Sequence, residues 1–170
     1  MIKIGLLSDT HGHLDTRVQH HFKNCNEIWH AGDIGTMEVL KTLESFKKTR
    51  AVYGNIDGGL LRQDLEEDLF FEVEGVKVWM THIGGYPGRF PARIKKILQE
   101  KGAPDLFICG HSHILKVMVD QQHDKMLCMN PGAAGKHGFH KVRTLLRFDL
   151  NNGRAENLEV IELGPRAKID

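Results

Sequence analysis

The sequence has few cysteines, no long apolar run and almost no net charge. Its 170 residues include three cysteines, Cys25, Cys109 and Cys128, with no CxxC pair. We therefore expect reduced thiols in a cytoplasmic protein rather than a disulfide framework. No segment approaches the roughly 18 consecutive apolar residues of a membrane span, which argues against a membrane protein. The opening segment MIKIGLLSDT has one lysine and a short apolar run, so it resembles a strand more than a signal peptide.

The charges nearly cancel, with 23 Lys and Arg against 22 Asp and Glu. This balance argues against a dedicated nucleic-acid surface, because such a surface needs an excess of positive charge. With 41% apolar and 26% charged residues, the composition is that of an ordinary globular protein, and the length fits a single domain over residues 1–170. Histidine is the exception, at 11 residues, so where the histidines lie becomes the main question.

Hydrophobic periodicity predicts alternating strands and helices, followed by hairpins. Strands are expected over 2–8, within 27–33, over 50–57 and over 104–113. Helices are expected from about Leu14, from Thr36 as N-cap through 37–46, and over 90–101 between Pro91 and Gly102. Hairpins are expected over 69–82, 115–129 and 142–163. This order predicts an α/β (α+β) fold in which helices cover layered sheets.

Chemically reactive side chains follow five of the predicted strands, in SDTHGH, HAGD, GNID, THIGG and GHSH. Ligands of α/β sheets bind where the carboxyl ends of strands meet, so we expect these segments to form one site. Residues i and i+2 of an extended chain share a side, which lets His111 and His113 converge. The donors are carboxylates, imidazoles and one amide, from Asp9, His11, Asp33, Asn55, His82, His111 and His113. Such donors suit Mn, Fe, Co, Ni or Zn, and seven ligands fit two ions better than one.

The order of these motifs resembles the signature of the calcineurin-like metallophosphoesterases: DxH, GD, GNH-[DE] or a variant, a histidine, and GHxH. Here the motifs are DTH at 9–11, GD at 32–33, GNID at 54–57, THIGG at 81–85 and GHSH at 110–113. The short chain and NPGAAG at 130–135 resemble the small single-domain phosphodiesterase branch. The resemblance implies a four-layer αββα sandwich, in which helices flank two mixed β-sheets.

The resemblance also implies a dimetal centre in which Asp33 bridges two ions. Asp9, His11, Asp33 and His113 would hold the first ion, and Asp33, Asn55, His82 and His111 the second. Mn²⁺ would be the working metal, with Zn²⁺, Fe²⁺, Ni²⁺ and Co²⁺ as alternatives. A hydroxide shared by the ions would attack phosphorus, since metals lower the pKa of bound water. The implied activity is hydrolysis of a small phosphodiester or a nucleotide-like substrate.

One position departs from the family pattern. Many members have a histidine after GN that protonates the leaving group, and Ile56 stands there instead. We hypothesise either substrates with low-pKa leaving groups or a recruited acid such as His13. Asp57 would then orient a ligand histidine or form the turn before Gly58. Asn130 in NPG is interpreted equally well as part of a turn or as a wall of the site.

Other functions remain open on the same fold. A phosphomonoesterase or a nucleotide pyrophosphohydrolase would use the same ligands. A non-catalytic protein-binding scaffold, like the phosphoesterase-like subunit of the retromer coat, would need an exposed apolar patch. The C-terminal hairpin strands also offer an edge for a homo-oligomer. The HxHxDH motif of a metallo-β-lactamase is absent, and an amidohydrolase barrel needs about 250 residues.

Overall fold

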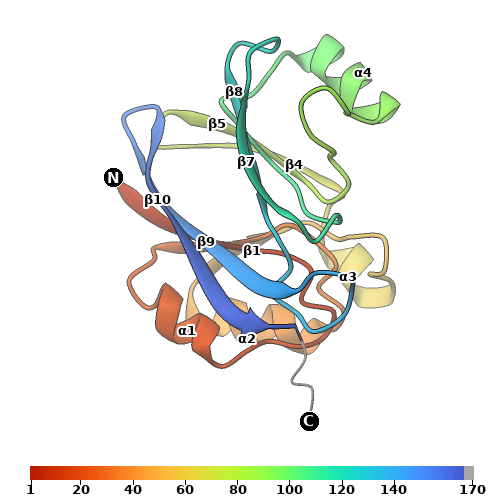
Figure 1. Cartoon of the computed structure of the whole chain (residues 1–170), viewed down its shortest axis with the longest axis vertical. Coiled ribbons are helices and arrows are strands. Elements are labelled where there is room, and N and C mark those ends of the chain that lie inside the picture. The colour runs from red at the N-terminus through yellow and green to blue at the C-terminus, as the bar shows by residue number, and fades with distance from the viewer. Residues whose placement is uncertain (167–170) are drawn as a thin grey trace.

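The computed structural model describes residues 1–166, in which ten strands form two five-stranded sheets (Figure 1). The first sheet contains β1 (Ile2–Leu7), β2 (Glu27–His30), β3 (Lys48–Ala51), β9 (Val142–Asn151) and β10 (Arg154–Pro165). The second contains β4 (Asp68–Val73), β5 (Val76–Thr81), β6 (Leu106–Ile108), β7 (Leu115–Asp120) and β8 (Met126–Pro131). Their spatial orders are β10-β9-β1-β2-β3 and β4-β5-β6-β8-β7. Both sheets mix parallel and antiparallel pairs.

Helices cover the outer face of each sheet. In Figure 1, α1 (Arg17–Phe22) and α2 (Met37–Phe46) lie beside the first sheet, and α4 (Ala92–Lys101) lies at the far end beside the second. The short α3 (Gly59–Asp64) follows β3. Leu40 and Leu43 of α2 share a buried cluster with Leu7 of β1, and Ile94 of α4 packs with Trp79 of β5. The predicted four-layer αββα sandwich is therefore confirmed.

The main core lies between the two sheets, and strand alternation fills it. Ile4 and Leu6 of β1 point into this layer, with Val78 and Met80 of β5 facing them from the second sheet. Leu7, one residue further along β1, turns to the helix side instead, as the two-residue period of a strand requires. Both sheets thus depend on one shared apolar layer. Residues 167–170 of the domain predicted over 1–170 lie outside the described residues.

Several predicted boundaries differ from the observed ones. The helix expected from about Leu14 begins at Arg17, because the Asp15 side chain accepts from the Arg17 N–H in a turn that precedes the helix. The strand expected over 50–57 ends at Ala51, and α3 was not predicted, since its first residue is the helix-disfavouring Gly59. Thr36 caps α2 as predicted, with its side chain accepting from the Val39 N–H. Among residues 1–166, no helix is both long and apolar enough to span a membrane.

A charged cluster joins β2 to β3 inside the first sheet. Glu27, 4% exposed, accepts hydrogen bonds from Arg50 Nε at 2.8 Å and Trp29 Nε1 at 2.9 Å. Lys48 lies 2.6 Å from its other oxygen. Burial alone would raise the pKa of Glu27, but Arg50, Lys48 and Trp29 outweigh it and lower the pKa to about 2. The folded state therefore prefers the ionised carboxylate.

We predict that Glu27→Gln destabilises the protein at neutral pH by about 1–3 kcal/mol, because Arg50, Lys48 and the buried Trp29 lose a charged acceptor. As pH falls, the unfolded state takes up this proton near the ordinary pKa of 4.5, whereas the folded state resists until about 2. The advantage of the wild type over the variant should thus be full above pH 4.5 and vanish between 4.5 and 2. Urea unfolding of both proteins at several pH values measures this.

Glu44→Gln, which removes an exposed ion pair with Lys41, is the matched control and should leave the unfolding midpoint nearly unchanged. An equal effect of the two substitutions would contradict the assigned role of Glu27.

Candidate metal centre

The candidate ligands lie on loops that leave one end of each sheet. Asp9 and His11 follow β1, Asp33 follows β2, and Asn55 follows β3. These three strands are mutually parallel, so their carboxyl ends meet at one edge. From the second sheet, His82 follows β5, and His111 and His113 follow β6, which are also parallel to each other. The two sheets therefore present their loops to one another, as the five motifs predicted.

The structure brings the predicted side chains into two groups of possible metal ligands. Asp9, His11 and His113 form one group, and Asp33, His82 and His111 form the other; within each group the ligand atoms lie within 4.8 Å of one another. Asn55 joins the second group, because its Oδ1 lies 2.9 Å from His111 Nδ1. The seven residues predicted as ligands thus lie in two adjoining clusters.

Each aspartate has one oxygen engaged by the protein and one open to the site. Asp9 Oδ2 accepts from the Ser8 hydroxyl at 2.7 Å and from the His111 N–H at 3.1 Å. Asp33 Oδ1 accepts from the Ile56 N–H at 3.0 Å. The other oxygens face histidines: Asp9 Oδ1 lies 3.1 Å from His113 Nε2.

Asp33 Oδ2 lies between the two groups. It is 3.2 Å from His82 Nε2 in its own group and 3.5 Å from His11 Nε2 in the other. Asp9 Oδ1 is 3.8 Å from the same His11 nitrogen. Asp9 Oδ1 also lies 3.9 Å from His82 Nε2 of the other cluster, but Asp33 Oδ2 makes the shorter contact between clusters and is the better placed bridging ligand.

The site contains buried polar atoms that have no hydrogen-bond partner within the protein. Among the described residues, four buried side-chain polar atoms have no hydrogen-bond partner, and three belong here: Asp9 Oδ1, His11 Nε2 and His82 Nε2. Buried polar groups nearly always have a partner, because leaving one unpaired costs about 1–3 kcal/mol. Three such atoms facing one another fit divalent cations as their missing partners.

The electrostatics of the site also favour a cation. Burial lowers the pKa of His82, but the Asp33 and Asp9 carboxylates outweigh it and raise the pKa above its ordinary value. Burial would raise the pKa of Asp9, yet the nearby His11 and His113 rings hold that pKa well below its usual range. Two carboxylates that stay ionised in a buried site attract positive charge, whether a proton or a metal ion.

Most of the ligands have a strained backbone. Five of them have left-handed φ angles, namely Asp9 (54°), His11 (47°), Asp33 (52°), His111 (69°) and His113 (60°). This conformation costs an L-residue about 1–2 kcal/mol. In the described part of the chain, the remaining non-glycine residues with positive φ are Glu74, Asp124, Lys125, Asn152 and Asn157, all in the turns and strands of hairpins. Strain outside hairpins is thus confined to this site, as is typical of functional loops.

Two motif glycines allow the loops to approach this closely. A Cβ added to Gly54 would overlap Asp33 Oδ1, and one added to Gly110 would overlap Ser8 Oγ and lie 2.7 Å from Asp9 Oδ2. Position 54 must therefore be a glycine, because Asp33 of another motif occupies the space that a side chain would need. Any side chain at either position would push two ligand loops apart.

Hydrogen bonds to the histidine rings orient their free nitrogens toward the site. His82 Nδ1 lies 2.7 Å from the Ala31 carbonyl, so in the neutral ring it donates there and leaves the Nε2 lone pair free. His140 Nε2 lies 2.8 Å from the Gly135 carbonyl and must donate to it. Its Nδ1 then accepts from His113 Nδ1 at 3.1 Å, which turns the His113 Nε2 lone pair toward Asp9.

His140 is a residue that sequence reasoning missed. It lies 27 positions beyond His113, on a loop with no motif spacing, and no role was assigned to it. A second such residue is the exposed His137, whose ring centroid is 5.1 Å from that of His11. Only the fold brings this loop to the ligands.

Buried polar residues link the ligand loops to one another. His30 Nδ1 accepts from the Gly32 N–H, and its Nε2 bonds to Thr10 Oγ1 at 2.9 Å. Burial lowers the pKa of His30 to about 4, so the ring stays neutral and can make both bonds. The carboxylate of Asp57 accepts from the backbone N–H groups of Ile34, Gly35 and Gly54. Asp57 thus holds the Asp33 loop against the Asn55 loop, and its bonds go to backbone amides rather than to a ligand histidine.

Comparison with known proteins identifies the family. Residues 2–153 match the model of the calcineurin-like phosphoesterase superfamily domain. This chain belongs to that superfamily. A probable metallophosphoesterase of Methanothermobacter thermautotrophicus is 30% identical over 137 residues, covering 76% of each chain. A phosphodiesterase of Methanocaldococcus jannaschii is 29% identical over 147 residues, covering 77% of this chain and 83% of the relative.

The fold is shared with solved structures of lower identity. Vps29 from Entamoeba histolytica, solved in complex with Zn²⁺, has a TM-score of 0.68 at 17% identity, covering 95% of this chain and 99% of that chain. At this identity the likeness confirms the fold alone.

The unpaired buried nitrogens and oxygens fit the divalent ions of a metallophosphoesterase. Asp9, His11 and His113 would hold one ion, and His82, His111 and Asn55 the other, with Asp33 between them. Carboxylate oxygens suit Mn²⁺ and imidazole nitrogens suit Zn²⁺, so this mixed donor set without thiolate can hold either ion.

The phosphoesterase has no acid at the position after Asn55, as its sequence indicated. The Ile56 N–H donates to Asp33 Oδ1, and Ile56 is 47% exposed. His13, the acid expected to replace it, lines a separate cavity with Asp15 and Glu38, and none of the candidate ligands lines that cavity in residues 1–166. Burial and the charge of Lys136 lower the pKa of His13, which reduces its protonated fraction. The structure therefore does not support His13 as the acid.

We predict that His140→Phe weakens metal binding about 10–100-fold, because partners of ligand histidines fix the ring and its tautomer. The phenyl ring keeps the size but cannot accept from His113. Titration calorimetry of metal-stripped protein with Mn²⁺ measures the affinity. His20→Phe, on the exposed face of α1, is the control and should bind as the wild type does. Unchanged affinity in a folded His140→Phe protein would count against the role given to His140.

Proposed function

We propose that the protein is a dimetal phosphodiesterase that hydrolyses small phosphodiesters with Mn²⁺. The observation that carries this proposal is the position of Asp33 Oδ2, 3.2 Å from His82 and 3.5 Å from His11. When bound, two divalent ions would polarise a phosphoryl oxygen and lower the pKa of water toward neutrality. The similarity to an archaeal phosphodiesterase supports the same reaction class.

The protein's own residues hold this centre rigid. The Ile56 and His111 amides fix the aspartates, and His140 fixes His113. Preorganised ligands need little rearrangement as charge develops on phosphorus, which lowers the activation barrier. Because Ile56 cannot donate a proton, substrates with low-pKa leaving groups should react fastest. This favours diesters that carry one activated ester group.

A second candidate function is a protein-binding scaffold, and one observation favours it. Large apolar side chains are exposed next to the ligands: Ile83 (44%) follows His82, Ile114 (61%) follows His113, and Phe139 (104%) precedes His140. Exposed apolar residues near one site are typical of interaction surfaces. A phosphomonoesterase or a nucleotide pyrophosphohydrolase would use the same ligands, and substrate comparison separates them.

We predict that metal-stripped protein regains hydrolysis of bis(4-nitrophenyl) phosphate on addition of Mn²⁺, at a higher kcat/KM than for 4-nitrophenyl phosphate. Asp33→Asn should lose at least about 10³-fold in kcat and bind fewer than two ions, since the open oxygen is shared by both clusters. Initial rates with each metal added back, together with metal analysis, measure both effects.

Asp124→Asn, an exposed carboxylate in the turn between β7 and β8, should behave as the wild type. Two tightly bound ions without turnover of either ester would favour the scaffold. Faster monoester turnover would favour the phosphomonoesterase.

A further inference from the structure

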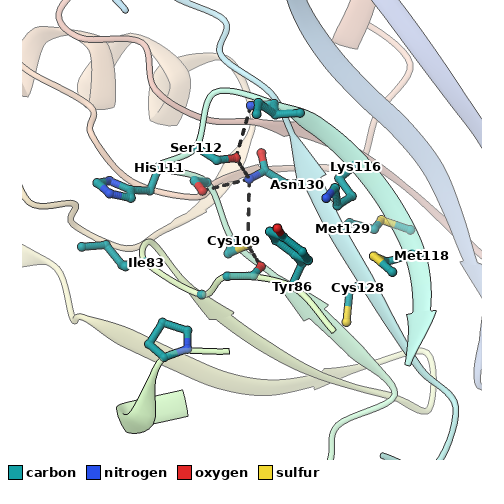
Figure 2. Close-up of a pocket in the computed structure, with 15 residues that line it drawn as sticks. Ile83, Tyr86, Cys109, His111, Ser112, Lys116, Met118, Cys128, Met129 and Asn130 are labelled. Atoms are coloured by element: carbon teal, nitrogen blue, oxygen red, sulfur yellow. Dashed lines mark hydrogen bonds between the residues drawn. The ribbon is translucent and has the colours of Figure 1, made fainter. Parts of the chain in front are cut away.

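A pocket of about 170 Å³ opens beside the metal centre, on the outer face of the second sheet (Figure 2). Its walls come from the loop between β5 and α4, the loop after β6, and strands β7 and β8. His111, a ligand of the second group, lines it. In the view of Figure 2, His111 and Ile83 lie at one end, Met118 and Cys128 at the other, and Tyr86 between them. The pocket therefore runs from the metal centre into an apolar interior.

The pocket interior is mostly apolar, with the Lys116 ammonium as its charged group. Lys116 and Met118 lie two residues apart on one face of β7, and Ile114 directly precedes that strand; all three line the pocket. Cys109 and Cys128 also line it, and burial raises the pKa of each thiol to about 12. Both cysteines therefore act as small neutral apolar groups.

The polar groups of the wall already bond to one another. Asn130 Nδ2 donates to the Gly110 carbonyl at 2.8 Å and to Ser112 Oγ at 3.0 Å, and its Oδ1 accepts from the Gly132 N–H. Ser112 Oγ also accepts from the Ile114 N–H. Asn130 therefore holds the His111 loop as part of the wall, and its bond to the Gly132 N–H also stabilises the turn, so both interpretations that the sequence left open apply.

Positive charge lies at the edge of this apolar space. The Lys116 ammonium is 3.6 Å from the centroid of the Tyr86 ring, over its face. At the other end, the His111 group would hold a metal ion. An occupant with an anionic head and an apolar body complements this distribution, since the head meets the cation and the body leaves water.

We propose that this pocket binds an apolar, single-ring organic group attached to the substrate's phosphorus, while the phosphoryl group lies at His111. The inference rests on the proposed function and narrows its substrate class to diesters that carry one aryl-sized group. The size supports this choice, because an apolar cavity of about 150 Å³ is enough to bind benzene.

The test compares two stable probes, phenylphosphonate and methylphosphonate, with the Mn²⁺-loaded protein in titration calorimetry. Both have the same anionic head, and only the phenyl ring can fill the pocket. We expect Kd for phenylphosphonate to be at least about tenfold lower, with a more negative heat-capacity change because apolar surface is buried. Equal Kd values would overturn the proposal.

Paired variants locate the effect on the pocket. Met118→Trp should fill the pocket and reduce the phenyl preference to less than about threefold, with methylphosphonate affinity unchanged. Val117→Trp, one residue along on the opposite face of β7, is the matched control and should keep the preference, because Val117 is exposed and does not line the pocket. Met118→Ala gives a second test that does not depend on overpacking. It enlarges the pocket and should therefore lower the Kd of 1-naphthylphosphonate relative to that of phenylphosphonate. A phenyl preference that survives in folded Met118→Trp protein would overturn the proposal.

Failure of the pocket and failure of the proposed function give different results. Diester hydrolysis without a phenyl preference would overturn the pocket proposal and leave the phosphodiesterase standing. A phenyl preference that Met118→Trp removes, in a protein that hydrolyses neither ester, would support the pocket and overturn the enzymatic proposal.

Discussion

Two ionised carboxylates buried beside the same histidine are the constraint on which the rest of the structure depends. Asp9 and Asp33 both lie within 4 Å of His11 Nε2, and Asp9 is fully buried. Ionised groups in a poorly polar interior are costly unless opposite charge or hydrogen bonds compensate them. Backbone amides, a hydroxyl and imidazoles compensate part of this buried charge, and metal ions would compensate the rest. Around this centre, backbone strain and unpaired atoms are concentrated.

The surrounding fold holds that centre together. Parallel pairing of β1, β2 and β3 brings three loops to one edge, and the shared apolar layer fixes the second sheet's loops against them. Asp57 and His30 then join neighbouring loops through backbone amides and Thr10. These bonds are buried, so they persist without competition from water. The ligands can keep strained φ angles because the packed strands and buried hydrogen bonds behind them fix their backbone.

The two proposals share one physical basis. The proposed metal centre would attract an anionic phosphoryl group, and the adjoining pocket offers apolar surface beside the same His111. Exposed Ile83 and Ile114 continue that apolar surface outward. In the proposed phosphodiesterase, which has no acid at Ile56, binding energy from an organic group would raise the rate, since it would position the ester at the ligands.

What the sequence by itself determined was which candidate ligands follow the strands, and its motif order, through the family resemblance, implied the four layers. Motifs that follow strands indicate candidate ligands from the sequence, because strand alternation and the position of strand carboxyl ends are local properties of a chain. The β4–β5 hairpin and the capped α2 were likewise predicted, from turn chemistry and periodicity. The short α3 was not, since its helix depends on packing of Leu61 rather than on propensity. Only the tertiary structure decided that His140 orients His113, that His13 faces another cavity, and that an apolar pocket adjoins His111. Each of these joins residues far apart in the chain, and their meeting is set by how two sheets pack, a property that no local pattern encodes.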